Sequence, residues 1–475
     1  MVDLKRVFVK GGIISPSELK QIISYAESLG LDALHFGSRQ DIIFPAHEQN
    51  ETVEHQYAKL STGMISDIQY QNIVSSYVSS DIFGSTTWLH GATYLYIMES
   101  FKYNPQLKIN IVDPEQQLVP LFSGQLNFIA SPHEDYWYLH INLPHLKASA
   151  YYPVLIYSWD IAKISKTIEE VYLDTEDVDE LFVLINALLE TNSRTIESNL
   201  NVSFKPFPYY EGMNKMGINQ YWLGLYWRNN RYYLNFLRDF CDFCLDNRIG
   251  KISITPWKSF IVKGIPKASK LALEKLLGKA GINIRHSLLE LNWHLPVDDD
   301  KALALKTYIV KNFDQNDIST YGLTFAISKS KGSHSYFTSI VIEKNTSPSI
   351  EGGFETRDTY NVLYSENFDP NSQKYIVYAQ DINQLELSGL LMELSKLYFE
   401  QFSIGNEEAD KGDKSEVTPE KFEVYQCQDC LTVYNNIYGD ENAKIEANTS
   451  FENVPSAYKC DVCDAPKSNF VKVKM

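Results

Sequence analysis

Long apolar runs, cysteine and basic residues are all scarce in this sequence. No stretch approaches the roughly 20 consecutive apolar residues of a membrane-spanning helix, and residues 1–12 lack the apolar core of a secretory signal. Six cysteines among 475 residues are too few for the disulfide framework of a secreted protein. We therefore expect a cytoplasmic protein that does not insert into a membrane.

Basic residues are outnumbered by acidic ones. Lys and Arg number 43 against 60 Asp and Glu, which gives a net charge of −17 at pH 7. Because this charge repels phosphate backbones, we expect no nucleic-acid partner. Hydrophobic residues make up 44% of the chain and aromatic residues 13%, which is typical of a folded protein, and the length suffices for about three structural units.

The six cysteines form three pairs with the spacing CxxC. One pair is Cys241 and Cys244, and the last four cysteines have the arrangement C-x2-C-x29-C-x2-C: Cys427, Cys430, Cys460 and Cys463. Two such loops can bring four thiolates around one ion in a tetrahedral cage. Soft, anionic sulfur ligands in a reducing compartment select iron or zinc, so the spacing predicts a metal site on these four residues.

The residues around the four cysteines resemble a rubredoxin. The likeness lies in the cysteine spacing and in these further residues: Tyr434, Gly439-Asp440, Phe451, Val454-Pro455, Tyr458, Ala465-Pro466-Lys467 and Phe470. The resemblance implies one iron ion that cycles between the ferric and ferrous states, with zinc as the alternative occupant. It also implies an aromatic core made of Tyr425, Tyr434, Phe451, Tyr458 and Phe470.

Two positions depart from the rubredoxin pattern. Rubredoxins usually have glycine directly after each CxxC, in a left-handed backbone conformation, and this chain has Leu431 and Asp464 there. Asp tolerates a positive φ moderately well, whereas Leu loses about 1–2 kcal/mol in that conformation. If fewer amide groups then donate to the sulfurs, the reduction potential of the centre falls.

The chain divides into four parts. Residues 404–421 are polar and carry charges of both signs without an apolar period, which is typical of a flexible linker. The metal-binding domain follows at residues 422–475, and residues 1–205 and 206–403 form two repeats, as the next observation indicates.

A helix-strand-turn-strand pattern occurs twice. Ser15 as N-cap, Glu18 completing a capping box and Gly30 as terminator predict a helix, which two short strands follow at 33–36 and 41–44. Adding 218 to these positions gives a similar pattern, with a helix at 234–245 and strands at 252–254 and 260–262. We infer a diverged internal duplication.

The duplication also indicates the role of the remaining cysteine pair. Cys241 and Cys244 map onto Ile23 and Ala26, which belong to the apolar face of the first helix. We therefore expect these two thiols to be buried packing residues without a role in metal binding or disulfide exchange.

Both repeats resemble the ferredoxin-like half-domains and catalytic-type domains of the sirohaem-dependent nitrite and sulfite reductases, over about residues 1–400. The segments 11–42 and 251–265 carry the likeness. That family holds its haem and a four-iron cluster with four cysteines in the second half, and this chain has no cysteine between Gly281 and Phe402. The sequence thus predicts an α+β fold with a duplicated reductase-like body that has neither sirohaem nor a 4Fe-4S cluster, plus the small metal-bound domain.

The resemblance also implies an anion pocket in the body. Arg39 and Lys108 stand where the family has cations that bind nitrite or sulfite, whereas Gln71 and Gln106 replace two others. The alternative is that Arg39 and Lys108 are ordinary exposed or ion-paired side chains.

Taken together, these features predict an electron-transfer protein that carries one electron on a mononuclear iron centre. The body would dock redox partners, namely a reductase and an electron donor, or would bind a ligand, and the resemblance suggests nitrite or sulfite assimilation as the context. We do not expect the chain itself to be a catalytic reductase. Two alternatives remain, a nitrite or sulfite reductase with unconventional haem binding and a zinc-stabilised scaffold.

Overall fold

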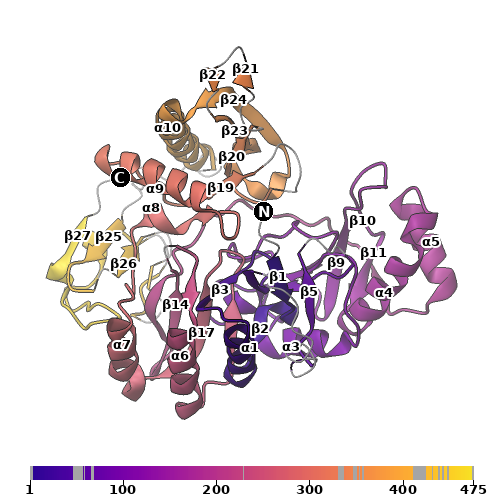
Figure 1. Cartoon of the computed structure of the whole chain (residues 1–475), viewed down its shortest axis with the longest axis horizontal. Coiled ribbons are helices and arrows are strands. Elements are labelled where there is room, and N and C mark those ends of the chain that lie inside the picture. The colour runs from indigo at the N-terminus through magenta and orange to yellow at the C-terminus, as the bar shows by residue number, and fades with distance from the viewer. Residues whose placement is uncertain are drawn as a thin grey trace.

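The computed structural model describes residues 4–472, with the exception of 46–56, 58, 66–68, 228, 330–335, 346–349, 352–353, 356–357, 410–423, 431, 437–438, 441–442 and 447–448. Figure 1 shows a large body of helices and sheets with a small domain at its side, which contains the C-terminal residues. The chain is therefore a mixed helix and sheet protein, as the sequence predicts.

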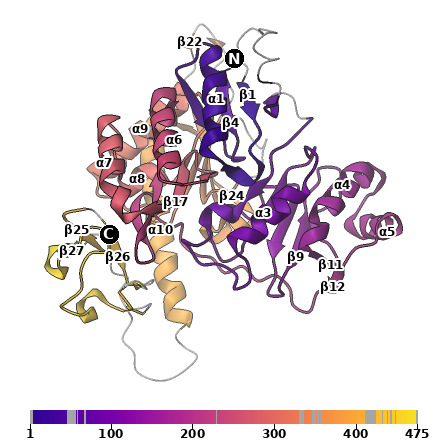
Figure 2. The same cartoon turned by 90° about the horizontal axis from the view of Figure 1, so that it is seen from below.

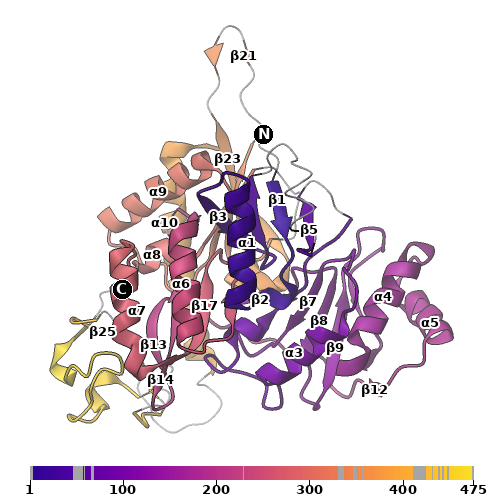
Figure 3. The same ribbon diagram turned by 60° about the horizontal axis from the view of Figure 1, so that its bottom comes forward.

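The predicted duplication is present. Helix α1 (Pro16–Ser28) begins with a complete capping box, in which the Ser15 hydroxyl accepts the N–H of Glu18 and the Glu18 carboxylate accepts the N–H of Ser15. Helix α6 (Leu234–Asp246) begins 218 residues later and lies beside α1 (Figure 3), and an ion pair of 2.6 Å between Lys20 and Asp242 joins the two. Both helices cover the same pair of sheets.

These two sheets exchange their edge strands. The first sheet has the order β15-β3-β4-β1-β5 and the second the equivalent order β2-β16-β17-β14-β13. Strand β2 comes from the first repeat and β15 from the second, so each repeat completes the sheet of the other. Their bounds are β1 Leu4–Val7, β2 Ile13–Ile14, β3 Ala33–Phe36, β4 Ile42–Pro45, β5 Thr62–Met64, β13 Gly212–Met216, β14 Gln220–Leu225, β15 Tyr232–Tyr233, β16 Ile252–Ile254 and β17 Phe260–Pro266.

The turns between the paired strands have the same conformation in both repeats. The N–H of Gly37 donates to the carbonyl of Asp41 at 2.8 Å, and the N–H of Thr255 donates to the carbonyl of Ser259 at 2.9 Å. The fourth residue of each turn has a positive φ, 58° at Gln40 and 57° at Lys258. The duplication therefore extends to backbone detail.

Each repeat adds a second sheet. In the first repeat β6, β7 and β8 run parallel and β9 and β11 follow antiparallel, and in the second β18, β19 and β20 run parallel before β23 and β24. Their bounds are β6 Val74–Ser75, β7 Ile109–Val112, β8 Leu126–Ala130, β9 Tyr136–Ile141, β10 Ala150–Tyr151, β11 Val154–Tyr157, β12 Ser193–Thr195, β18 Trp293–His294, β19 Phe325–Ser328, β20 Ile340–Lys344, β23 Thr359–Ser365 and β24 Tyr375–Asn383. Strands β21 Ile350–Glu351 and β22 Phe354–Glu355 pair with each other in a separate sheet.

Further helices accompany these sheets. Their bounds are α3 Gly91–Ser100, α4 Ile161–Val171, α5 Val178–Leu188, α7 Lys270–Lys279, α8 Leu288–Leu291, α9 Asp300–Gln315 and α10 Gln384–Ala409. Helix α10 extends to Ala409 and so includes the first residues of the expected linker, whose remainder lies outside the described residues. None of the helices in the described ranges is both long and apolar enough to cross a membrane.

One hydrophobic core is shared by the two ferredoxin-like units. It contains residues of α1 and α6 together with strands of both exchanged sheets. Cys241 and Cys244 are fully buried in it, and burial raises the pKa of the Cys241 thiol to about 12. The prediction that this pair packs in the core is confirmed by this burial. That the pair has no role in metal binding or disulfide exchange stays a prediction, which the burial favours because buried, protonated thiols are poor metal ligands.

The C-terminal domain is a small three-stranded antiparallel sheet with the order β26-β25-β27. Figure 2 shows it next to α7 on the side of the second repeat. Its strands are β25 Val424–Cys427, β26 Val433–Asn435 and β27 Phe470–Lys472. Gly439 makes a turn with a φ of 63°, and a side chain there would collide with the carbonyl of Glu446.

Candidate metal centre

Two matching loops present the four cysteines. The N–H of Cys427 donates to the carbonyl of Thr432 at 2.8 Å, and the N–H of Cys460 donates to the carbonyl of Ala465 at 2.7 Å. Each loop is thereby closed by a hydrogen bond between residues five positions apart, and both sulfurs of each CxxC point to the same side. The sequence spacing thus produces two equivalent halves of one site.

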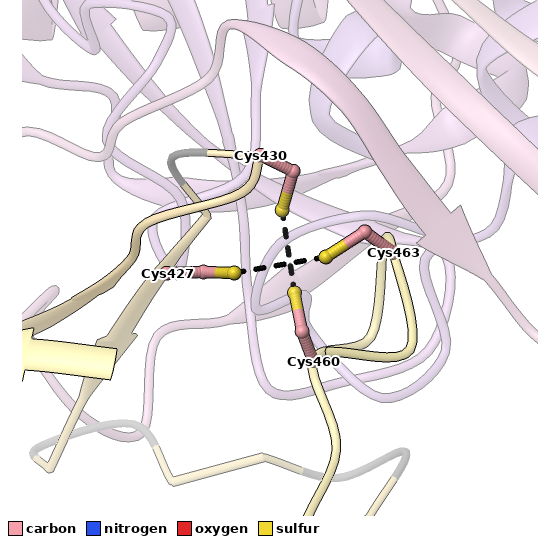
Figure 4. A group of neighbouring side chains, drawn as sticks. All are labelled: Cys427, Cys430, Cys460 and Cys463. Carbon is pink, nitrogen blue, oxygen red and sulfur yellow. Dashed lines mark hydrogen bonds between the residues drawn. The ribbon is translucent and has the colours of Figure 1, made fainter. Parts of the chain in front are cut away.

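The four sulfur atoms converge on one point. Figure 4 shows them facing each other, with Cys427 opposite Cys463 at 3.6 Å and Cys430 opposite Cys460 at 3.3 Å, and all four lie within 4.8 Å of one another. A tetrahedral ion with metal–sulfur bonds of about 2.3 Å needs sulfur separations of roughly 3.8 Å. The donor set and its spacing therefore fit one thiophilic ion.

The centre is buried on one side and open on the other. Cys427 and Cys460 are fully buried, Cys430 is half-buried and Cys463 is exposed. Hydrogen bonds from the Cys460 thiol and from Thr432 lower the pKa of Cys430 to about 4. The pKa of Cys460 is raised, because its thiol donates to Cys430 and is buried, although backbone groups of Val462 and Cys463 donate to its sulfur. These backbone donors and Thr432 are the groups that would stabilise negative charge on the sulfurs in a metal-thiolate centre.

Aromatic rings pack behind the sulfurs as the sequence predicts. Tyr425 stacks on Phe451 with ring centroids 4.2 Å apart, and Phe451 also contacts Tyr434, Tyr458 and Phe470. The last three rings and Phe451 are buried with Cys427 and Cys460 in one cluster. Through this packing, the rings fix the positions of the two loops.

One departure from the expected glycine pattern can be assessed. Asp464 has a φ of 60°, which is the left-handed conformation that the sequence predicts at this position. Its N–H donates to the carbonyl of Cys460 at 2.9 Å, so the loop keeps a regular turn. Leu431 lies outside the described residues.

The C-terminal domain is similar to known rubredoxins. The family model described as rubredoxin matches residues 424–470. Rubredoxin-2 of Chlorobaculum tepidum is 41% identical over 51 residues, which are 11% of this chain and 98% of that protein. The chain belongs to the rubredoxin family through its C-terminal domain. The probable rubredoxin HupI of Bradyrhizobium diazoefficiens is also 41% identical, over 49 residues, 10% of this chain and 71% of that protein.

Within this rubredoxin domain, the structure brings together the four cysteines that the sequence predicts as metal ligands. A rubredoxin domain with four converging cysteines implies one bound iron ion and a role in electron transfer. An iron ion at this site supplies one-electron redox chemistry, while the protein provides the thiolates, the amide donors and the aromatic packing.

The body has a solved structural neighbour. The NirA protein of Mycobacterium tuberculosis superimposes with a TM-score of 0.63 and 13% sequence identity, covering 83% of this chain and 80% of that one. At this identity the likeness establishes the fold alone. It confirms the nitrite/sulfite reductase-like fold that the sequence predicts for the body.

The structure brings Arg39 and Lys108 close together. Arg39 donates to the side chain of Asn110 at 2.6 Å and to the carbonyls of Asn72 and Ile109 at 2.7 and 2.9 Å. Burial, partly offset by Asp41, lowers the pKa of Arg39 to about 9. Burial and the charge of Arg39 also lower the pKa of Lys108, whose ammonium has no hydrogen-bond partner among the described residues. The Arg39 guanidinium is thus largely occupied by hydrogen bonds within the protein, whereas the Lys108 ammonium is not.

Two further cations, which sequence reasoning missed, join this region. Arg6 lies 3.3 Å from the buried carboxylate of Asp41, and its charge lowers the pKa values of both Arg39 and Lys108. Lys258, from the second repeat, is fully buried, and burial lowers its pKa to about 7. The sequence offered one signal for Lys258: the offset of 218 pairs it with Gln40, which lies in the equivalent turn, next to Arg39. We call Arg6, Arg39, Lys108 and Lys258 the cation cluster.

The equivalent position in the second repeat has a different character. Trp257 corresponds to Arg39 by the offset of 218, and Thr324 precedes β19 as Lys108 precedes β7. Both residues line a cavity of about 210 Å³, whose other walls include aromatic and amide side chains. The duplication has therefore diverged, since of these paired positions only those of the first repeat carry cations.

Proposed function

We propose that this chain is a one-electron carrier, in which the rubredoxin domain holds iron that cycles between the ferric and ferrous states. The convergence of four sulfurs within 4.8 Å in a rubredoxin domain carries this proposal. The exposed Cys463 gives a redox partner an approach to the centre. A reductase and an electron donor are the partner classes, and a reducing cytoplasm suits the free thiols.

The visible spectrum and metal content of the purified chain test this proposal. We expect one iron per chain and sulfur-to-iron charge-transfer bands that bleach on addition of dithionite and return in air, because only ferric thiolate centres absorb in this way. A colourless protein with one zinc per chain would contradict electron transfer and support the zinc-stabilised scaffold.

We further propose that the reductase-like body, arranged as repeats 1–205 and 206–403, has neither sirohaem nor a 4Fe-4S cluster and serves docking or ligand binding. Support comes from the absence of cysteine between Gly281 and Phe402 and from the burial of Cys241 and Cys244. A tetrapyrrole spectrum in the purified chain would instead support a nitrite or sulfite reductase with unconventional haem binding.

The cation cluster favours a small oxyanion as the ligand of the body. Arg6, Arg39 and Lys258 interact with the buried carboxylate of Asp41. Lys108 interacts with the like charges of Arg39 and Arg6, and its ammonium is available to a ligand. The nitrite/sulfite reductase-like fold makes nitrite and sulfite the anions to examine first, with assimilation of these ions as the context.

Thermal unfolding in the presence of sulfite tests this anion site. We expect sulfite to raise the Tm of the wild-type chain, by the equivalent of about 1.4 kcal/mol at ten times its Kd, and to have little effect on Lys108→Ala. Lys102→Ala removes an exposed lysine six positions earlier in the chain and should respond as the wild type does. Equal responses of all three proteins would refute the site.

A further inference from the structure

The rubredoxin domain is held against the second repeat through the cysteine loops themselves. Lys270 of α7 donates to the carbonyl of Val462 at 2.7 Å, between Cys460 and Cys463, and Lys215 of β13 pairs with Asp461 at 3.2 Å. Figure 1 shows the domain on this side of the body. The contacts thus fall on the loop that carries half of the metal site.

The other cysteine loop is contacted by an arginine. Arg285 donates to the hydroxyl of Thr432 at 3.4 Å, and this hydroxyl lies 3.1 Å from the sulfur of Cys430. A side-chain hydrogen bond of 2.8 Å from Asn435 to the Tyr321 hydroxyl also joins the domain to the body. Both cysteine loops therefore meet basic groups of the body.

The body holds Arg285 in place. The neighbouring His286 donates its backbone N–H to the buried carboxylate of Glu211 at 2.6 Å, and its Nδ1 lies 2.6 Å from the same carboxylate. Arg285 also donates to the Asn214 side chain at 3.2 Å and lies over the ring of Tyr209. Because these partners all belong to the second repeat, the guanidinium is positioned by the body before the domain docks.

The charge of the centre depends on its redox state. Four thiolates with a trivalent ion carry a net charge of −1, and the same thiolates with a divalent ion carry −2. Arg285 is linked to the Cys430 sulfur through Thr432, and Lys270 binds the carbonyl of Val462 within the other cysteine loop. Charges this close to a partly buried centre interact more strongly than they would in water. Lys215 is paired with Asp461 and contributes mainly to the fit of the two surfaces.

We propose that docking of the rubredoxin domain is coupled to its redox state: Lys270 and Arg285 bind the reduced centre more tightly than the oxidised centre. This inference deepens the proposed electron-carrier function and rests on it for the native metal. Reduction adds one electron to the ferric ion and one negative charge to the centre, so it strengthens docking. By linkage, docking raises the reduction potential by the same free energy. Cys463 remains exposed in the docked state, so a donor can reach the centre there.

Potentiometry of the full-length iron protein tests the coupling. We expect Lys270→Gln combined with Arg285→Gln to lower the ferrous-to-ferric ratio at a fixed potential by roughly tenfold at low salt, and the difference to shrink near 1 M salt. Lys275→Gln is the matched control, since Lys275 is an exposed lysine of the same helix that makes no hydrogen bond or ion pair with the domain among the described residues. Equal ratios in the double variant and in the control would overturn the proposal.

Metal substitution tests docking without redox chemistry. Its result therefore distinguishes failure of the charge-coupled docking from failure of the proposed electron-carrier function. A zinc(II) centre has the charge of the ferrous state and a gallium(III) centre that of the ferric state. We expect acetylation of Lys270, measured by mass spectrometry relative to Lys275, to be several-fold slower in the zinc form than in the gallium form. Equal rates would refute charge-coupled docking even if the native metal proved to be zinc.

Discussion

Replacing Cys460 with serine should abolish stoichiometric metal binding and unfold the rubredoxin domain. The Cys460 sulfur is fully buried and lies 3.3 Å from that of Cys430, so no other described ligand can take its place. A serine hydroxyl stays protonated at neutral pH and is a poor ligand for a thiophilic ion. In small metal domains the bound ion contributes on the order of 10 kcal/mol to folding. Elemental analysis and near-ultraviolet circular dichroism measure the two effects.

Cys241→Ala is the matched control for this experiment. It also removes a buried thiol, but one in the core of the body, and should leave the metal content at that of the wild type. Retention of one metal per chain in Cys460→Ser, or loss of the metal in Cys241→Ala, would show that the four-sulfur site is assigned wrongly.

The metal centre could be predicted from the sequence because its determinants are local. Each CxxC loop is closed by hydrogen bonds within five residues, as between Cys460 and Ala465, and the left-handed turn at Asp464 follows from the position after the motif. The capping box of Ser15 and Glu18 is local in the same sense. Such features depend on the nearest neighbours in the chain and on the periodicity of apolar residues.

The environment of Arg39 could not be predicted in this way. Its hydrogen-bond partners Asn72 and Asn110 lie 33 and 71 positions further along the chain, and the charge of Arg6 reaches it across a strand pair. The docking contacts of the rubredoxin domain join residues still further apart, 246 positions in the pair of Lys215 and Asp461. Contacts of this kind depend on how sheets and domains pack, which residue patterns do not specify.

Truncation of Phe240 to alanine should destabilise both ferredoxin-like units together. Phe240 is fully buried and contacts the rings of Phe236 and Phe260 in a core to which both repeats contribute. Loss of such a ring costs about 3–5 kcal/mol, through lost burial and the cavity that remains. Its counterpart by the offset of 218 is Ile22, also fully buried, and Ile22→Ala should cost about 2–5 kcal/mol. Hydrogen exchange of β3–β4 and of β16–β17 reports on each unit separately.

In both variants, exchange should accelerate by a similar factor in the two strand pairs, since β2 and β15 tie each sheet to the other repeat. Leu245→Ala, on the exposed face of α6, should change stability by less than about 0.5 kcal/mol. Faster exchange in β3–β4 alone for Ile22→Ala would mean that the repeats fold independently. The cation cluster contains residues of both repeats, and the turn of Arg39 is tied to the second repeat by the Gln40 side chain, which donates to the carbonyl of Ile254 at 2.9 Å. Independent folding of the repeats would therefore also argue against this cluster.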